Sequence, residues 1–500
     1  MKRSLYHDDV VFLSPAADFS SYVKYGATVV ASGGIHSSDY INKLKQQGLH
    51  VGGTVWCLTA PGHDLHANPD LAAATARDIT GEPIAIPWIA PDSHSNAPAV
   101  FGCVNHPAFR AYMRRKVCDA MAGGADGLHV DEHLGSAAAA LSLGGCFCDF
   151  CVAGFAAYCA QRQNQELLRT AKVSSFENFN YRSFVKTYAP TRDQYISLKG
   201  AIPLHAEFVD FQLGCAADNV ASLGRLAQDV AAGPVSLSAN VCLPGLEHTV
   251  VVPQLTYCTG EIDHNAAQGG MGLGTAVSAY RMAETLRIPM AATATPRDWA
   301  FVNSQNAEQL VCLWIALAYA CGQRFMAPNR MLCAAPNGSS QWFCGSAATF
   351  SPLYSFVKKH GFLLNDFSAA GPLSRPDALP VSFETTDKRK ALGEALAARP
   401  ATPLAAGDGV LVFPRVKGDG TVAIHVVNCS YSVNSKRIAP QTNLEVRIPN
   451  SIFNRNFSGG TAYSYGAEPF KLTVENQGDT SVFVLPELKL WSIVTFEYWA

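Results

Sequence analysis

Short apolar runs alternate with amphipathic, helix-period segments along the first three quarters of the chain. The runs are rich in β-branched residues and bounded by polar or glycine positions, which is typical of buried parallel strands. They predict strands at Ser4–Leu13, Ala27–Ser32, Val51–Leu58, Gly127–Glu132, Val235–Val241, Leu255–Ile262, Ile288–Thr295 and Arg324–Met331. Helical periodicity is found between them at Ser38–Gln47, Ala108–Met121, Ala206–Ala232, Ala276–Arg287 and Ala307–Gly322.

Eight strand signals, each followed by a helix or a long excursion, favour an α/β chain with a (β/α)8 TIM barrel. A doubly wound open sheet is the alternative, but no G-x-G-x-x-G follows an early strand. The pattern changes after about residue 375. A stretch rich in Pro, Ala and charge precedes a series of strand-like runs without helices. We therefore expect a barrel over 1–374, a linker or loop over 375–405 and a small C-terminal β-sandwich over 406–500.

The composition limits the classes of molecule that we expect the protein to bind. Of the 500 residues, 48% are hydrophobic and 16% are charged, and 38 basic residues balance 40 acidic ones to give a net charge of −2. This balance gives no electrostatic basis for nucleic-acid binding. The longest apolar stretch, Val311–Cys321, is about half of the roughly 20 residues that cross a bilayer. We therefore expect no membrane partner. We expect a cytoplasmic location by default, because Asp8 and Asp9 interrupt any signal-like start. A barrel with an appended sandwich is also compatible with a homodimer.

Polar groups concentrate in two of the predicted strands. Strand 1 contains Tyr6-His7-Asp8-Asp9, and strand 4 contains His129-Val130-Asp131-Glu132-His133. Period-two alternation places His129, Asp131 and His133 on one face, where ionisable groups are costly unless they are used or paired. The candidates for catalysis are therefore Asp9, His129, Asp131 and His133. A purely structural network, in which Asp131 holds His129, is the alternative.

Other predicted strand ends supply groups that suit a polyhydroxylated substrate. Aromatic rings stack on sugar faces and arginine grips carboxylates. The candidate substrate ligands are His36, Trp56, Asn240, Arg297, Asn329 and Arg330. Two alternatives stay open: Trp56 can be core packing, and the arginines can pair with acids such as Asp298.

The sequence gives little support for other classes of enzyme. The chain has no Walker loop, H-E-x-x-H or G-x-S-x-G motif. A metal hydrolase would suit several histidines, but the H-x-H pair expected on strand 1 is absent because the chain has Y-H-D-D there. We expect no cofactor for catalysis.

A cysteine motif follows strand 4. In the order GLHVDEHLG then GGCFCDFC, the chain resembles the barrel glycoside hydrolases. Cys103 in CVNHP, together with Cys146, Cys148 and Cys151, is similar to the four-thiolate zinc site of the family 42 β-galactosidases. This resemblance implies a structural zinc at the four cysteines, and four reduced thiols without a metal are the alternative. The catalytic N-E pair of that family does not follow strand 4 here.

Over nearly its whole length the chain more closely resembles the inverting (β/α)8 exo-sialidases of glycoside hydrolase family 156. The matching positions are in YHDD and HVDEH. The resemblance implies that Asp9 activates water and His129 protonates the leaving oxygen of sialylated glycans, with Asp131 and His133 orienting them. One alternative is a neutral-sugar, β-galactosidase-like enzyme with Asp131 or Glu132 as the acid and Glu261 or Asp263 as its partner. The other is a carbohydrate-binding barrel without turnover.

Overall fold

The structure is a computed structural model that describes residues 4–16, 18–34, 37–59, 69–89, 97–162, 165–334, 341–370, 383–397 and 404–498. Eight parallel strands form its central sheet, in the order β1-β2-β3-β6-β7-β8-β9-β10. Their bounds are Val11–Phe12, Val29–Val30, His50–Trp56, Gly127–Asp131, Ser236–Asn240, Tyr257–Ile262, Met290–Ala294 and Arg324–Phe325. The Ala327 backbone N–H donates to the Val11 carbonyl at 2.8 Å, so the last strand meets the first. The predicted (β/α)8 barrel is confirmed.

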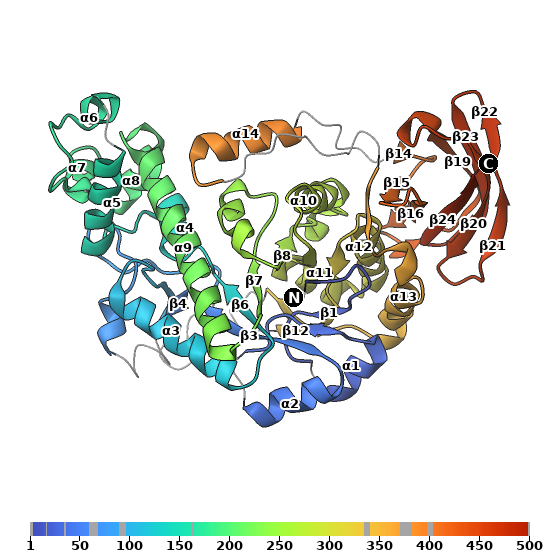
Figure 1. The fold of residues 1–500 in the computed structure, drawn as a ribbon, viewed down its shortest axis with the longest axis horizontal. Coiled ribbons are helices and arrows are strands. Elements are labelled where there is room, and N and C mark those ends of the chain that lie inside the picture. The colour runs from blue at the N-terminus through green and yellow to red at the C-terminus, as the bar shows by residue number, and fades with distance from the viewer. Residues whose placement is uncertain are drawn as a thin grey trace.

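Helices cover the outside of the barrel (Figure 1). They are α1 (Phe19–Tyr25), α2 (Ser38–Gln46), α3 (Pro107–Ala122), α9 (His205–Ala231), α10 (Leu273–Thr285), α11 (Pro296–Gln305), α12 (Glu308–Ala320) and α13 (Ala347–Lys359). After β7 the chain forms the 3-10 segment η5 (Leu246–Gln254) in place of an α-helix. Helix α12 is buried from Leu310 to Ala320, which explains why this part of the sequence is the most apolar stretch.

Two excursions leave the barrel. Between β6 and α9 the chain builds a helical lobe of α4 (Ser136–Ala138), η3 (Ala139–Leu143), α5 (Asp149–Gln161), α6 (Gln165–Ala171), α7 (Tyr181–Lys186) and α8 (Arg192–Leu198). Aromatic rings such as Phe147 and Phe208, stacked at 5.2 Å, form the core of this lobe. The shorter excursion is the hairpin of β11 (Asn329–Cys333) and β12 (Gln341–Cys344), which follows β10.

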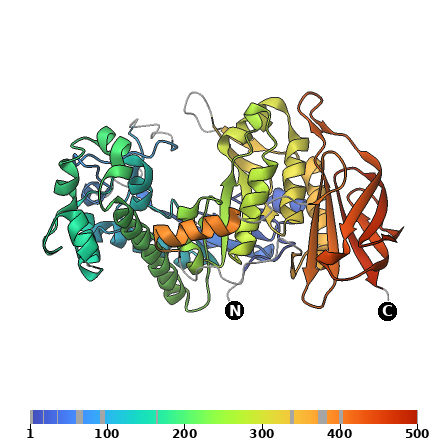
Figure 2. The same cartoon turned by 90° about the horizontal axis from the view of Figure 1, so that it is seen from above.

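The C-terminal part consists of antiparallel sheets, as expected. One sheet has the order β13-β15-β16-β24-β20-β21, and β19-β23-β22 form another. The strands are β13 (Phe367–Ala369), β15 (Val410–Lys417), β16 (Val422–Asn428), β19 (Gln441–Pro449), β20 (Phe457–Ser464), β21 (Phe470–Thr473), β22 (Glu475–Gln477), β23 (Thr480–Leu488) and β24 (Trp491–Tyr498). The sandwich packs beside the barrel, at the opposite side from the α5–α8 lobe (Figure 2).

The segment expected to be a linker contains a helix, α14 (Thr386–Ala397). The expectation of a loop there is wrong because Ala, Leu, Lys and Glu, which dominate residues 386–397, are strong helix formers. Leu392 is fully buried, and the position of Gly393 faces Leu246 of η5. The helix therefore packs on the barrel and is not an exposed linker between the two domains.

In the described part of the chain, no helix is long and apolar enough to cross a membrane. The homodimer stays a prediction.

Candidate active site

A pocket of about 370 Å³ opens at the carboxyl ends of β6, β7 and β8. This is the end of the barrel where such folds carry their active sites. Carboxylates, imidazoles and an indole surround it. The described lining residues are Trp88, Asp131, Glu132, His133, Leu134, Ala138, Leu141, Ser142, Asn240, Cys242, His248 and Glu261. Of the predicted residues, Asp131, His133 and Asn240 are thus brought together in one pocket, with Glu132 and Glu261 of the alternative carboxylate pair.

The Glu132 side chain also lines this pocket, because strand β6 ends at Asp131. The Glu132 backbone has a φ of 49°, in the left-handed region, and its N–H donates to the Asp131 carboxylate at 2.9 Å. The turn breaks the period-two alternation, so consecutive side chains both line the pocket. The left-handed conformation is unusual for a residue other than glycine, and such conformations concentrate at functional sites.

Glu261 approaches from β8, two strands away from β6. Because neighbouring strands are about 4.8 Å apart, the carboxyl groups from β6 and β8 start from backbones roughly 10 Å apart, with Asn240 of β7 between them. Burial raises the pKa of Glu261 to about 7, and the charges of Asp131 and Glu132 add to the rise. Burial likewise raises the pKa of Glu132 to about 7, against the lowering effect of a hydrogen bond from Trp88. Both groups can therefore hold or release a proton near neutral pH.

Two histidines form one wall of the pocket. His248 from η5 lies beside His133, with Nδ1 of His248 and Nε2 of His133 3.3 Å apart. Burial lowers the pKa of His248 to about 4. Burial, followed by the neighbouring His248 and His129, lowers the pKa of His133 well below its ordinary value. Both rings are therefore neutral hydrogen-bonding groups at pH 7.

Two half-exposed tryptophans hold the carboxyl groups of Asp131 and Glu132. The Trp56 indole N–H donates to Asp131 at 3.0 Å, and the Trp88 indole N–H donates to Glu132 at 2.6 Å. Their side chains are 47% and 56% exposed. Trp56 is therefore a ring at the barrel mouth, and the core-packing alternative is wrong.

The structure separates Asp9 from this pocket. The expected strand Ser4–Leu13 is reduced to Val11–Phe12, and Asp9 precedes it at the amino end of the barrel. The Asp9 carboxylate accepts the Tyr6 backbone N–H at 2.8 Å, and its carbonyl accepts the Tyr319 hydroxyl at 2.8 Å. The expectation that Asp9 stands at a catalytic strand end is therefore wrong: it closes a turn that enters the strand.

His129 lies inside the barrel, below the pocket. Its Nδ1 is 2.9 Å from the Ser238 hydroxyl, its side chain is buried, and burial lowers its pKa. His129 is not among the residues that line the pocket.

The remaining predicted ligands lie away from the pocket lining. Arg297 is exposed and faces Asp263, with Nη2 and Oδ2 3.7 Å apart. Asn329 is buried and donates to the Ser21 hydroxyl at 3.3 Å. The Arg330 guanidinium lies over the Trp342 ring, 5.2 Å from its centre. None of the three is among the described residues that line the pocket, and β10 ends at Phe325, before Asn329 and Arg330. Their role as substrate ligands stays a prediction, and His36 lies outside the described residues.

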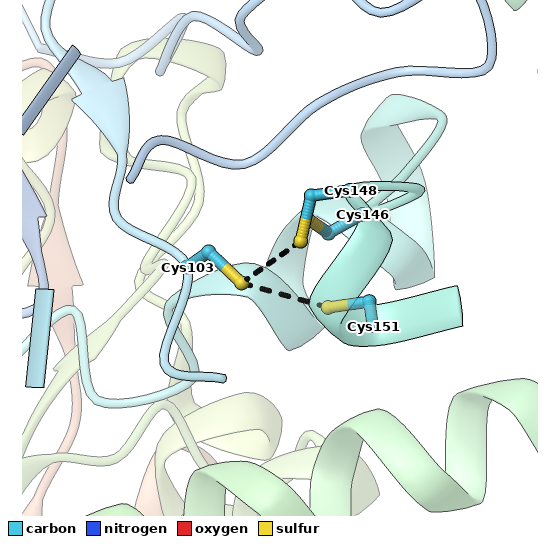
Figure 3. Close-up of side chains that lie close together, drawn as sticks. All are labelled: Cys103, Cys146, Cys148 and Cys151. Atoms are coloured by element: carbon cyan, nitrogen blue, oxygen red, sulfur yellow. Dashed lines mark hydrogen bonds between the residues drawn. The ribbon is translucent and has the colours of Figure 1, made fainter. Parts of the chain in front are cut away.

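The four cysteines of the predicted metal site are buried together, with Cys103 on the segment before α3 and the other three at the start of α5 (Figure 3). All four sulfurs lie within 4.8 Å of one another. Tetrahedral zinc–thiolate bonds of about 2.3 Å require sulfurs about 3.8 Å apart, so the arrangement fits this ion. The Arg77 backbone N–H donates to Cys146 and the Asn105 amide to Cys151, both at 3.4 Å, and such donors stabilise thiolates. The cluster is closed and lies outside the pocket lining, which suits a structural ion.

Among the pocket residues that the sequence analysis did not single out are an indole, a thiol and an imidazole: Trp88, Cys242 and His248. Trp88 and His248 lie on irregular segments that only the tertiary fold brings to the strand ends. The only indication of Trp88 in the sequence is the partly apolar run that ends at this residue, and runs of this kind also occur in many surface loops.

No family model and no curated protein sequence matches the chain. Solved structures that share its fold include the following three. An α-L-fucosidase from Paenibacillus thiaminolyticus matches at a TM-score of 0.54 and 10% identity over 99% of this chain and 100% of its own. A β-galactosidase from Bacillus circulans sp. alkalophilus matches at 0.54 and 10% over 98% and 99%. A cycloisomaltooligosaccharide glucanotransferase from Paenibacillus sp. matches at 0.55 and 10% over 97% and 84%.

The chain has the fold of barrel glycosidases. At this identity the likeness extends to the barrel and its C-terminal domain, and the chemistry has to be argued from the pocket.

Proposed function

We propose that the protein is a glycoside hydrolase that acts on a neutral sugar, with Glu132 and Glu261 as its acid–base pair. The observation that carries the proposal is that two glutamates on opposite sides of β7 face one pocket, each with a pKa of about 7. A glycosidase needs one carboxyl group that is protonated and one that is ionised across the scissile bond. Burial raises both pKa values to about 7, and the negative charges around the pocket add to the rise, so that one glutamate can be protonated while the other is ionised near neutral pH.

We assign the role of proton donor to Glu132. Its carboxyl group is fixed by the Trp88 indole beside a half-exposed ring that can stack on a sugar. Glu261 then activates water or attacks the sugar from the β8 side. Asp131, held by Trp56, and the Asn240 amide are available to bind hydroxyl groups.

The exo-sialidase activity stays a prediction that the pocket does not favour. A sialoside carries a carboxylate, which glycosidases bind with cationic groups. No lysine or arginine is among the described residues that line the pocket, and both of its histidines are neutral at pH 7.

The test is hydrolysis of a panel of nitrophenyl glycosides in both anomeric forms, with an α-sialoside included. We expect turnover of a neutral glycoside and a loss of roughly 10³-fold in kcat for each of Glu132→Gln and Glu261→Gln. Asp263→Asn is the matched control, because Asp263 lies near the mouth but not in the pocket lining. Sialoside turnover that depends on Asp9 would restore the sialidase hypothesis, and binding of sugar without turnover would indicate a binding barrel.

We also propose that Cys103, Cys146, Cys148 and Cys151 bind one structural zinc ion. Four buried sulfurs at mutual distances suited to a tetrahedral ion support this. Such an ion would connect the segment that carries Cys103 to the loop before α5. Metal analysis of the purified protein, with about one zinc per chain expected, tests it.

A further inference from the structure

Trp88 has two contacts in the pocket wall. Its indole N–H donates to Oε1 of Glu132 at 2.6 Å, and its ring packs edge-on against Phe101 with centres 5.8 Å apart. Trp88 therefore fixes the orientation of a carboxyl group while its own position depends on the loop that carries it.

That loop is joined to the cysteine cluster by backbone contacts. The Arg77 N–H donates to Sγ of Cys146 at 3.4 Å, and the Arg77 carbonyl accepts the Phe147 N–H at 2.7 Å. The Cys103 N–H donates to the Ala74 carbonyl at 2.9 Å. β-bridges continue this small sheet through Pro83 and Ala85, three residues before Trp88.

A second part of the pocket wall leads into the same cluster. Leu141 and Ser142 line the pocket from η3, and the chain reaches Cys146 three residues after that segment ends. The Gly145 N–H donates back to the Ala139 carbonyl at 3.2 Å. Two segments that line the pocket are thus connected to the cluster of four cysteines shown in Figure 3.

We propose that Trp88 is a positioning residue for Glu132, and that a metal ion bound by the four cysteines holds Trp88 in place. The inference rests on the proposed glycosidase site and the proposed metal. The ion itself takes no part in the reaction. It fixes the 74–78 and 144–148 segments against each other, and the Trp88 indole then meets the carboxyl group of Glu132.

Tryptophan emission tests the link between the metal and Trp88 without any substrate. We expect removal of metal from the full chain by a chelator to change the emission, and Zn²⁺ alone to restore it. The change should persist in Trp56→Phe, since Trp56 lies on β3, and be lost in Trp88→Phe. An equal change in Trp88→Phe, or a protein that neither contains nor takes up metal, overturns the proposal.

The pH profile of kcat/KM tests the link between Trp88 and Glu132. The ionisable groups around Glu132 are Asp131, Glu261, Cys57, Cys242, His133 and His248, and all are unchanged in Trp88→Phe. Loss of the indole donor removes a contact that favours the ionised carboxylate, so the basic limb should move upward by about one pH unit.

Cys148→Ser should move the basic limb in the same direction. Trp342→Phe should leave it in place, because Trp342 is exposed on β12 and is not among the described residues that line the pocket. An unmoved limb in Trp88→Phe overturns the positioning role. If no glycoside is cleaved by the wild type, the proposed function fails, and the emission experiment alone still decides whether the metal holds Trp88.

Discussion

Arg389 of α14 lies 2.7 Å from Asp210 of α9, and the two side chains are only 5% and 11% exposed. The guanidinium also donates to the Phe383 carbonyl at 3.0 Å, and Asp210 accepts the Thr386 hydroxyl at 2.8 Å. This buried pair anchors the segment between barrel and sandwich to a barrel helix. Since α14 also packs on η5, which carries His248, the pair supports one wall of the pocket.

Arg389→Met should therefore be strongly destabilising. The substitution leaves the Asp210 carboxylate buried without its cation, which typically costs about 3 kcal/mol. Urea unfolding measures the loss. The matched control is Lys417→Met, which removes a pair with Asp366 whose side chains are 35% and 78% exposed; it should cost less than about 1 kcal/mol. Equal losses for the two variants would contradict a structural role for the buried pair.

Glu261→Gln should make the protein more stable at pH 8 while abolishing turnover. The pKa of Glu261 is raised from 4.5 to about 7 in the folded chain, so the folded state binds the proton more tightly than the unfolded state. Its contribution to stability is complete below about pH 4.5 and is lost as the pH rises through about 7.

The measurement is the free energy of unfolding of wild type and Glu261→Gln from pH 4.5 to 8. We expect the difference between them to grow in favour of the variant with rising pH, reaching on the order of 1 kcal/mol. Asp263→Asn serves as the control at the exposed edge. A difference that does not vary with pH would show that Glu261 has an ordinary pKa.

The barrel could be predicted because its strands are buried on both faces. The run Ile288–Thr295 is mostly apolar, and Val235–Val241 alternates apolar residues with Ser236, Ser238 and Asn240; the observed strands lie inside both runs. The sequence also indicated that polar groups gather at the end of this strand, in Asp131-Glu132-His133, although the alternation assigned from it ends at Asp131. Such patterns are local, so a single sequence contains them.

The other features of the site could not be predicted, because they depend on the residue at which strand pairing begins and on contacts between segments that are distant in the sequence. Periodicity does not reveal that the first run pairs only at Val11–Phe12, which moves Asp9 to the amino end. The left-handed turn at Glu132 breaks the alternation that was used to assign faces. Trp88 and His248 reach the pocket on irregular loops, whose paths are set by packing in the folded chain.

Cys148→Ser should release the metal and lower stability. Structural zinc contributes its binding energy to folding, so the loss should be on the order of several kcal/mol. Metal content and the thermal unfolding midpoint measure the two effects. Cys344→Ser is the matched control, because Cys344 is exposed on β12 and not part of the cluster. Wild-type metal content and stability in Cys148→Ser would contradict a four-thiolate site.

Asp9→Asn should leave the reaction nearly intact. The amide oxygen of asparagine can still accept the Tyr6 N–H that the Asp9 carboxylate accepts at 2.8 Å, although the negative charge near Arg324 is lost. We expect kcat/KM on the best glycoside to fall by less than about threefold, which is under 1 kcal/mol of transition-state stabilisation, and stability to fall by about 1 kcal/mol. Asp131→Asn changes a carboxylate inside the pocket and should lower kcat/KM more than about tenfold. A loss of turnover in Asp9→Asn with unchanged stability would mean that Asp9 reaches the substrate, and it would return the acid–base chemistry to the amino-terminal aspartate.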